Sequence, residues 1–164
     1  MTYVYNQPTD MVIKVGYEYQ PWHRGVVEKM NRVNYVWYAA YGSNINKLRF
    51  MKYIEDCRDK TPPVKEKQFM FSHPIYFANR SGRWENKGVA FLDIEQQGKA
   101  YGKLYLVTEE QLEQIHISVG KGPNWYNQMV QIGVEEGLPI KTITHTPRHI
   151  NDVNPSQDYL NVKC

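Results

Sequence analysis

The sequence predicts a mixed, β-rich domain of the α+β class with a few helices. Its 164 residues are enough to bury a substantial core in one domain. Apolar residues make up 41% of the chain, and thirteen tyrosines and four tryptophans are among them, which argues against disorder. Strand-like segments outnumber helix-like ones, and no internal repeat or linker separates them. We therefore divide the chain into an N-terminal extension, residues 1–33, and one domain, residues 34–164.

Strand signals run along most of the chain. Residues 11–20 alternate in polarity and predict one or two strands in the extension, which we expect to pack on the domain. Gln97-Gly98 favours a hairpin between the strands on either side of it. The strands predicted within the domain cover six segments: 34–41, 69–77, 88–95, 100–107, 125–134 and 140–146.

A first helix is predicted over residues 45–55. Asn44 or Asn46 precedes it, and an asparagine side chain is a good acceptor for the unpaired N–H groups of a helix start. Its expected apolar face consists of Leu48, Met51 and Ile54. Pro62-Pro63 cannot continue a helix, so we expect a loop over 58–67.

A second helix is predicted over residues 108–117, with Thr108 as its N-cap. Glu109 and Glu110 lie in its first turn, where interaction with the helix dipole explains their negative charge. A last helical turn is predicted within 155–162.

Bulk properties exclude several classes of protein. The formal charge of +3 is too mild for a nucleic-acid-binding surface. The longest apolar runs are too short to cross a membrane, and the first residues show no secretory signal, so we expect a cytoplasmic protein. Cys57 and Cys164 are too few for a disulfide or zinc framework. We expect neither a metal nor a cofactor.

The turn Tyr41-Gly42-Ser43-Asn44 joins the first strand of the domain to its first helix. Glycine tolerates a positive φ, and the N–H groups that follow converge near a helix dipole that favours negative charge. The sequence therefore predicts a seat for an anion. The alternative is that these residues only make a tight connection between strand and helix.

Four motifs occur in order along the chain: "YGSN", "HPIYFANRSGRWENKGVAFL", "GKAYGKLYLVTEEQLEQI" and "PSQDYL". Over residues 34–160 the chain resembles the γ-glutamylcyclotransferase-like proteins, which include short bacterial members. The resemblance implies a small mixed β-barrel with helices around it. It also implies a pocket in which backbone N–H groups of the turn hold the carboxylate end of a ligand.

The resemblance assigns eight residues of this chain to that pocket. The anion seat is the turn from Tyr41 to Asn44, and two tyrosines match tyrosines of the family's pocket wall. The loop 78–84 could bring an arginine and a tryptophan over the mouth, or could be a solvent-exposed connection. The predicted ligand-binding residues are Tyr41, Gly42, Ser43, Asn44, Arg83, Trp84, Tyr126 and Tyr159.

The chain departs from the family at the position of its catalytic glutamate. In the family that Glu carries a proton from the substrate's α-amine to the departing nitrogen. Counting back seven residues from Tyr126 places it at Val119, and no acid lies within three residues of that position. Glu113 should point elsewhere on the helix, and His116 is a weak substitute because a lone histidine on a short helix is usually structural. We therefore predict no catalytic residue.

Two functions remain. The first is non-catalytic binding of a small anionic molecule, either a nucleotide or a γ-glutamyl or amino-acid derivative, with sequestration of a nucleotide second messenger as one version. The second is a γ-glutamyl cyclotransferase that releases 5-oxoproline with an acid recruited from elsewhere. A scaffold with a vestigial pocket has least support. Relatives tend to continue past "PSxxYL" into a longer helix, so we expect the extension or a second subunit of a homo-oligomer to cover that side.

Overall fold

A computed structural model of the chain divides it into two compact units, residues 1–34 and 35–164. In the first unit, β1 (Thr2–Val4) pairs antiparallel with β2 (Ile13–Val15). The predicted packing of residues 1–33 on the domain lies outside what the structure describes. The described residues are 2–4, 13–15 and 33–163.

The second unit is built on a five-stranded sheet whose order is β4-β7-β3-β9-β8. The central strand β3 pairs antiparallel with β7 and parallel with β9. The residues of β3 from Val36 to Ala40 are all buried. A strand pairs with β3 on each side, and side chains pack on both faces of the sheet. The strands are β3 (Tyr35–Ala40), β4 (Glu66–Phe71), β7 (Ala100–Thr108), β8 (Gln128–Glu135) and β9 (Leu138–Thr144).

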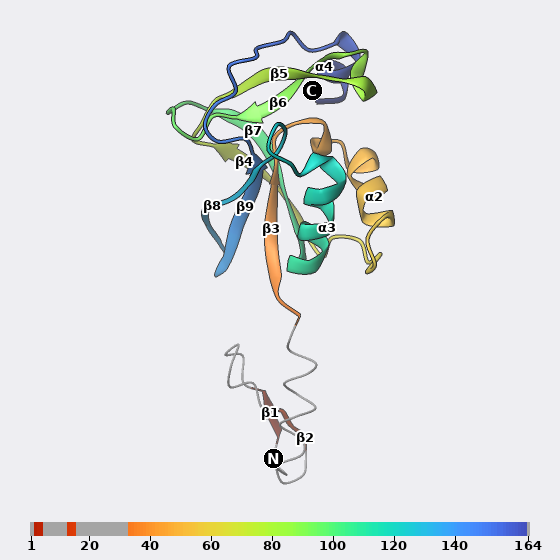
Figure 1. The fold of residues 1–164 in the computed structure, drawn as a ribbon. Helices are drawn as coiled ribbons and strands as arrows, with labels where there is room; N and C mark the ends of the chain where they lie inside the picture. The colour runs from red at the N-terminus through yellow and green to blue at the C-terminus, as the bar shows by residue number, and fades with distance from the viewer. Residues whose placement is uncertain (1, 5–12, 16–32, 164) are drawn as a thin grey trace. The chain divides into compact units, whose positions relative to one another are not determined.

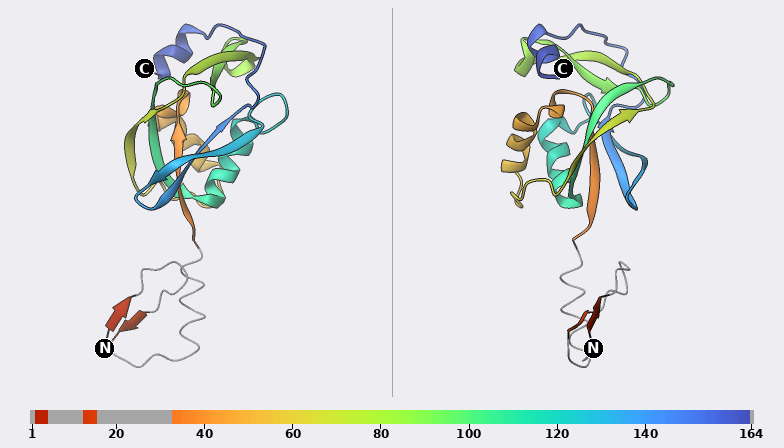
Figure 2. Two further views of the ribbon diagram at one scale, coloured as in Figure 1. Left: turned by 90° about the vertical axis from the view of Figure 1, so that its left-hand side faces the viewer. Right: turned by 180° about the vertical axis from the view of Figure 1, so that it is seen from behind.

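A second, two-stranded sheet lies across one end of the first, as Figures 1 and 2 show from three sides. It consists of β5 (Ile75–Ser81) and β6 (Lys87–Leu92), and α4 (Gln157–Lys163) lies beside it. Helices α2 (Lys47–Glu55) and α3 (Glu109–Gly120) lie together on one side of the five-stranded sheet. The predicted α+β class is confirmed.

The five-stranded sheet is not closed into the expected barrel, since β4 and β8 are its two edges. Ion pairs rather than backbone hydrogen bonds link these edges. Lys65 Nζ lies 3.0 Å from a carboxylate oxygen of Glu136, and Lys67 Nζ lies 2.9 Å from one of Glu135. The strands that could have continued the sheet, β5 and β6, pair with each other instead.

Two strand predictions were wrong. The segment predicted as one strand over 69–77 is divided between β4 and β5, because Pro74 has no N–H for a ladder and marks the point where the chain leaves the first sheet. The hairpin expected around Gln97-Gly98 does not form. β6 pairs with β5, whereas β7 pairs with β3 and β4.

Asn46 is the N-cap of α2, as one of the two alternatives predicted. Its Oδ1 accepts the backbone N–H of Arg49 at 3.1 Å. The predicted apolar face was wrong in one member: Leu48 is 80% exposed, and fully buried Phe50 takes its place beside Ile54. Phe50 is drawn inward because its ring stacks on that of Tyr105, with centroids 4.0 Å apart.

Helix α3 begins as predicted and ends later than predicted. Thr108 and Gln111 form a reciprocal capping box at its start. The helix continues to Gly120, where φ is +119°, a value that favours glycine. Val119 therefore lies in the last helical turn.

Alternate residues of β3 enter two hydrophobic clusters. Trp37, Ala39 and Tyr41, the residue just after the strand, belong to a cluster with residues of β5, β6 and α4. Val36, Tyr38 and Ala40 belong to the cluster under α2 and α3. Since successive side chains of a strand point to opposite faces, β3 ties the two layers together and ends at the turn of interest.

Candidate functional site

A cavity of about 440 Å³ lies where the end of β3, the two short 3-10 turns η1 (Ser43–Ile45) and η2 (Gly82–Trp84), α4 and the end of α3 come together. This volume is within the range of ligand sites in proteins. All eight residues that the sequence assigned to a pocket line it, although they come from four separate segments: Tyr41, Gly42, Ser43, Asn44, Arg83, Trp84, Tyr126 and Tyr159. Their role in binding stays a prediction.

The turn after β3 is tight for a different reason from the one predicted. Gly42 has a φ of −105°, so no positive φ requires a glycine there. A Cβ atom on Gly42 would instead lie 2.6 Å from the hydroxyl oxygen of Tyr159. Glycine is needed because α4 brings a tyrosine directly against the backbone of the turn.

Tyr159 is buried, and its hydroxyl oxygen accepts hydrogen bonds from backbone N–H groups. Ala90 N donates to it at 3.1 Å. Burial raises the pKa of Tyr159, and the N–H groups of Ala90 and Ser43 partly oppose that shift. The hydroxyl is therefore neutral at physiological pH and keeps its own proton for a further acceptor.

Tyr41 and Tyr126 contribute their rings to the wall, while their hydroxyl groups donate hydrogen bonds to backbone carbonyls of neighbouring strands. Tyr41 donates to the carbonyl of Ile143 at 2.6 Å, and Tyr126 donates to the carbonyl of Ala90 at 3.0 Å. Burial raises the pKa of both well above the usual value. Ala90 thus fixes Tyr126 through its carbonyl and Tyr159 through its N–H.

Asn44 lies in η1 and is only 7% exposed. Its Nδ2 donates to the hydroxyl of Tyr38 at 3.2 Å, and its backbone carbonyl accepts the hydroxyl of Tyr105 at 2.8 Å. Its Oδ1 is buried without a hydrogen-bond partner in the part of the chain that the structure describes. Unpaired buried amide oxygens are uncommon, and a bound molecule is one way in which they are satisfied.

Arg83 and Trp84 lie at the rim, on η2. Arg83 Nη1 donates to the hydroxyl of Tyr53 at 3.1 Å. The ring of Trp84 contacts that of Tyr159 edge-on, with centroids 4.8 Å apart. Arg49 Cζ lies 4.4 Å from the centroid of the Trp84 ring. The predicted loop 78–84 is instead the end of β5 followed by η2, and its residues 81–84 line the cavity rather than forming only a solvent-exposed connection.

Sequence reasoning missed nine residues of the wall: Tyr38, Tyr53, Ser81, Gly82, Val89, Ala90, Gly120, Trp125 and Ile143. Trp125 and Gly120 adjoin Tyr126 and Val119 in sequence, and that adjacency was the available signal. Tyr53 gives no local signal, because it reaches the cavity only where α2 passes η2. Burial raises the pKa of Tyr38, so its hydroxyl stays neutral.

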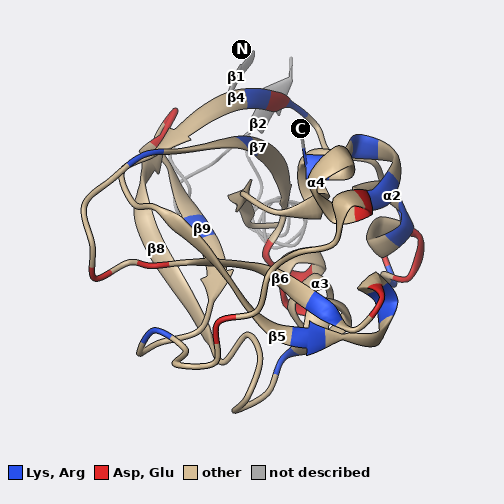
Figure 3. Ribbon diagram, turned by 90° about the horizontal axis from the view of Figure 1, so that it is seen from above, with Lys and Arg blue, Asp and Glu red and all other residues tan. Residues whose placement is uncertain are grey.

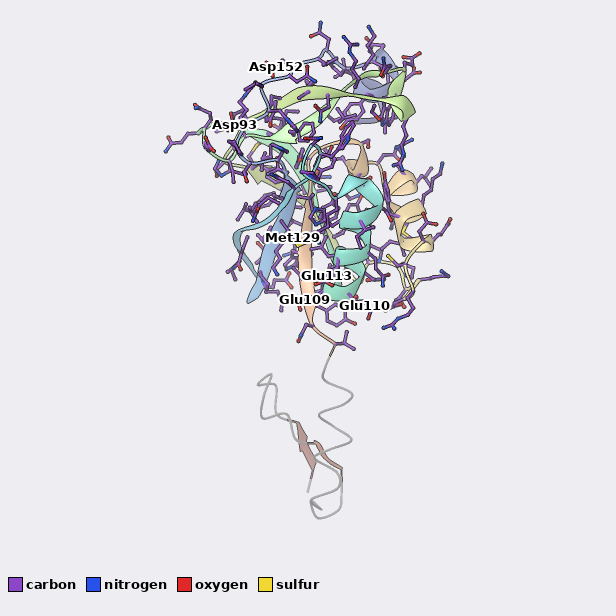
Figure 4. The ribbon with its side chains drawn as sticks, viewed as in Figure 1. Asp93, Glu109, Glu110, Glu113, Met129 and Asp152 are labelled. Carbon is purple, nitrogen blue, oxygen red and sulfur yellow. The ribbon has the colours of Figure 1, made fainter. Side chains whose placement is uncertain are left out.

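Val119 lines the cavity. Its match to the family's glutamate stays a prediction. Among the eighteen lining residues described, none is Asp, Glu, His or Lys. Figure 4 shows Glu109, Glu110 and Glu113 toward the other end of α3, away from Val119. The described wall thus offers no carboxylate to carry a proton.

His116 is not part of the wall. It is buried, and its Nε2 lies 2.6 Å from the carbonyl oxygen of Tyr126. Burial lowers its pKa, which keeps the ring neutral with its proton on Nε2. Its contact fixes the backbone that carries Tyr126, which is a structural role.

No group of three or more His, Cys, Asp or Glu side chains suited to a metal occurs in residues 2–4, 13–15 and 33–163. No helix over those same residues is long and apolar enough to cross a membrane.

Comparison with known proteins gives similarity of two kinds. No family model matches the sequence. The chain is 28% identical over 158 aligned residues to histone deacetylase 5 of Arabidopsis thaliana, covering 68% of this chain. It spans only 23% of the length of that curated relative.

The solved structures show a shared fold at low sequence identity. A gamma-glutamyl cyclotransferase has a TM-score of 0.59 at 18% identity, with 80% of this chain and 77% of that chain covered. An uncharacterized human protein gives 0.58 at 18% identity with the same coverage. YkqA of Bacillus subtilis gives 0.55 at 20% identity, covering 85% of this chain and 49% of that one.

Proposed function

We propose that this chain, which has the γ-glutamylcyclotransferase-like fold, holds a small anionic molecule in the cavity beside Gly42 and releases it unchanged. The observation that carries the proposal is the composition of the wall. It combines the turn Gly42-Ser43-Asn44, the Arg83 guanidinium and aromatic rings, and among the described lining residues it has no carboxylate.

The wall suits an anion in three ways. Arg83 brings a permanent positive charge to the rim. The neutral hydroxyl of Tyr159 has a proton to donate. The η1 turn leads into α2, whose N-terminal end carries partial positive charge.

The ligand we favour is a nucleotide or an acidic amino-acid derivative. A nucleotide would place its phosphate at the η1 turn and stack its base on the rings of the wall, since every base has a π-face for such stacking. Sequestration of a nucleotide second messenger in the cytoplasm is one form of this function. A nucleic acid polymer is not proposed.

The second candidate is γ-glutamyl cyclotransfer, the activity named for one of the proteins of similar fold. That reaction needs one group to act as base and then as acid. The described wall lacks a carboxylate for this step, and loss of such a group costs about 10²–10⁴ in rate. We therefore place this function second.

Incubation of the full chain with γ-glutamyl dipeptides and assay of 5-oxoproline separates the two functions. We expect no turnover above a blank for the wild type. The variant Val119→Glu places a carboxylate in the wall, and turnover gained there would show that the position matches the family's glutamate. Val119→Gln is the matched control, because it has the same size without the acid. Appreciable turnover by the wild type would overturn the non-catalytic proposal.

A thermal-shift screen of nucleotides and acidic amino-acid derivatives tests binding directly. A ligand present at 100 times its Kd stabilises the folded protein by about 2.7 kcal/mol. Arg83→Met, which removes the positive charge at the rim, should reduce the shift. Failure of every anionic candidate to shift the unfolding temperature would favour the scaffold.

A further inference from the structure

We propose that the cavity selects anionic ligands whose nitrogen is uncharged and rejects otherwise identical ligands that carry a free ammonium group. The inference rests on the proposed function, because it names the class of molecule that the same cavity holds. This selectivity would distinguish the cavity from one that binds a ligand through its free α-amine.

The described wall carries positive charge and no negative charge. Arg83 is its one side chain with a full positive charge, and no lining residue described carries a negative one. The polar groups that remain are neutral: the side chains of Ser43, Asn44 and Ser81, the tyrosine hydroxyls, and the indole N–H groups of Trp84 and Trp125. Such groups can hydrogen-bond an N–H, but they supply no counter-charge.

Further positive charge lies next to the wall. Arg49 Cζ lies 4.4 Å from the ring centroid of Trp84, and the Arg49 Nε is buried without a partner in the described part of the chain. Figure 3 shows basic positions along α2. One of them, Lys47, forms an ion pair with Glu66 at 2.9 Å and is therefore neutralised. Arg49, through its contact with the lining residue Trp84, therefore adds to the positive potential beside the cavity.

A free ammonium group would lose its hydration in this cavity without gaining a counter-ion. Burial of an unpaired charge is far more costly than burial of a neutral N–H that finds an acceptor. An acylated amine or the exocyclic amine of a nucleobase has such a neutral N–H. Both classes, acylated amino-acid derivatives and nucleotides, therefore share the required chemistry.

Matched probes test this selectivity by calorimetric titration of the full chain. The first set is γ-glutamyl-phenylalanine with its Nα-acetyl and Nα-ethyl derivatives, since the ethyl group adds similar bulk but keeps the ammonium charge. The second set is adenosine 5′-monophosphate with its N6-propyl and N6-(2-aminoethyl) derivatives. Within each set we expect the probe without ammonium to bind at least tenfold more tightly than its charged match of equal size.

A charge introduced into the wall gives an independent readout. Ser43→Asp adds a carboxylate at a half-buried lining position, and Ser43→Asn is the uncharged control of similar size. The preference for the uncharged probe, expressed as a ratio of Kd values, should fall at least tenfold in Ser43→Asp relative to Ser43→Asn.

The outcomes are distinguishable. Equal or tighter binding of the ammonium-bearing match overturns the selectivity and leaves the proposed function standing. An unchanged ratio in Ser43→Asp also overturns the selectivity, because the wall charge would then not set it. Failure of every probe to bind overturns the proposed function and the selectivity together. Binding confined to one set identifies which source of the shared chemistry the cavity accepts.

Discussion

Gly42 and Tyr159 meet so closely that a single methyl group on Gly42 would lie 2.6 Å from the tyrosine hydroxyl. The contact joins the turn after β3 to α4, which are more than a hundred residues apart in sequence. Because Tyr159 also accepts the N–H of Ala90, the contact positions β6 against the same turn. The shape of the cavity floor therefore depends on the absence of a side chain at residue 42.

The variant Gly42→Ala should lower the free energy of unfolding by about 1–3 kcal/mol, since overpacking displaces the tyrosine or the turn. Tyr159→Phe removes the hydroxyl, and the nearest remaining ring atom would then be 3.8 Å from the new methyl group. In urea unfolding the double variant should be more stable than the sum of the two single effects predicts, by about 1 kcal/mol or more. Simple additivity would contradict the proposed clash.

Arg83→Met should weaken binding of the tightest anionic probe about tenfold or more, because a charge-assisted hydrogen bond to the anion is lost. Its unfolding temperature should hardly change, since the side chain is exposed. Arg80→Met is the matched control, an exposed arginine of β5 that does not line this cavity. Equal losses of affinity in both variants would point to a general charge effect.

Protonation of His116 should destabilise the fold. Burial lowers the pKa of His116 in the folded protein, so the unfolded chain, with a pKa near the ordinary 6.5, binds the proton more readily. The stability that this histidine contributes is present above about pH 6.5 and is lost as the pH falls below it. His116→Gln retains a donor for the carbonyl of Tyr126 but cannot titrate.

The measurement for His116 is the free energy of unfolding at several values between pH 5 and pH 8. The wild type should lose more stability than His116→Gln as the pH falls. His149, whose pKa burial also lowers, is present in both proteins, so the difference between the two curves isolates His116. Parallel curves would mean that the ring is not held neutral.

Phe50→Ala should cost about 3–5 kcal/mol, because it removes a fully buried ring stacked on Tyr105. Leu48→Ala should change the free energy of unfolding by less than about 0.5 kcal/mol, since Leu48 is mostly in solvent. Thermal or urea unfolding of the two variants compares them within one helix. A larger loss of stability in Leu48→Ala than in Phe50→Ala would mean that the face predicted from sequence spacing, which includes Leu48, is the buried one.

Local sequence features predicted most of the secondary structure. Thr108 was predicted as an N-cap and Asn46 as one of two candidates, because the side chain and the N–H it bonds lie within three residues of each other. The strand before Gly42 was evident from its run of apolar residues. Leu48 was wrongly placed on the buried face because a helix of nine residues has two neighbouring apolar stripes. The stripe that contains Phe50 is the buried one, since Phe50 stacks on Tyr105.

The sheet topology was beyond local reasoning. Gln97-Gly98 resembles a hairpin turn, but strand pairing is decided by which partner buries more apolar surface. β6 pairs with β5, and its side chains pack in the cluster that also holds Tyr159. Because β5 and β6 pair only with each other, the five-stranded sheet keeps β4 and β8 as free edges and does not close into the expected barrel.

The sequence by itself determined the α+β class and the turn after the first domain strand, since polarity patterns and capping chemistry are local properties. The resemblance to a known family named eight of the eighteen residues that line the cavity. Only the tertiary structure decided why residue 42 is glycine, that Tyr53 and Arg83 meet at the rim, and that the described wall has no acid. These depend on contacts between segments far apart in the chain, which no local pattern of residues specifies.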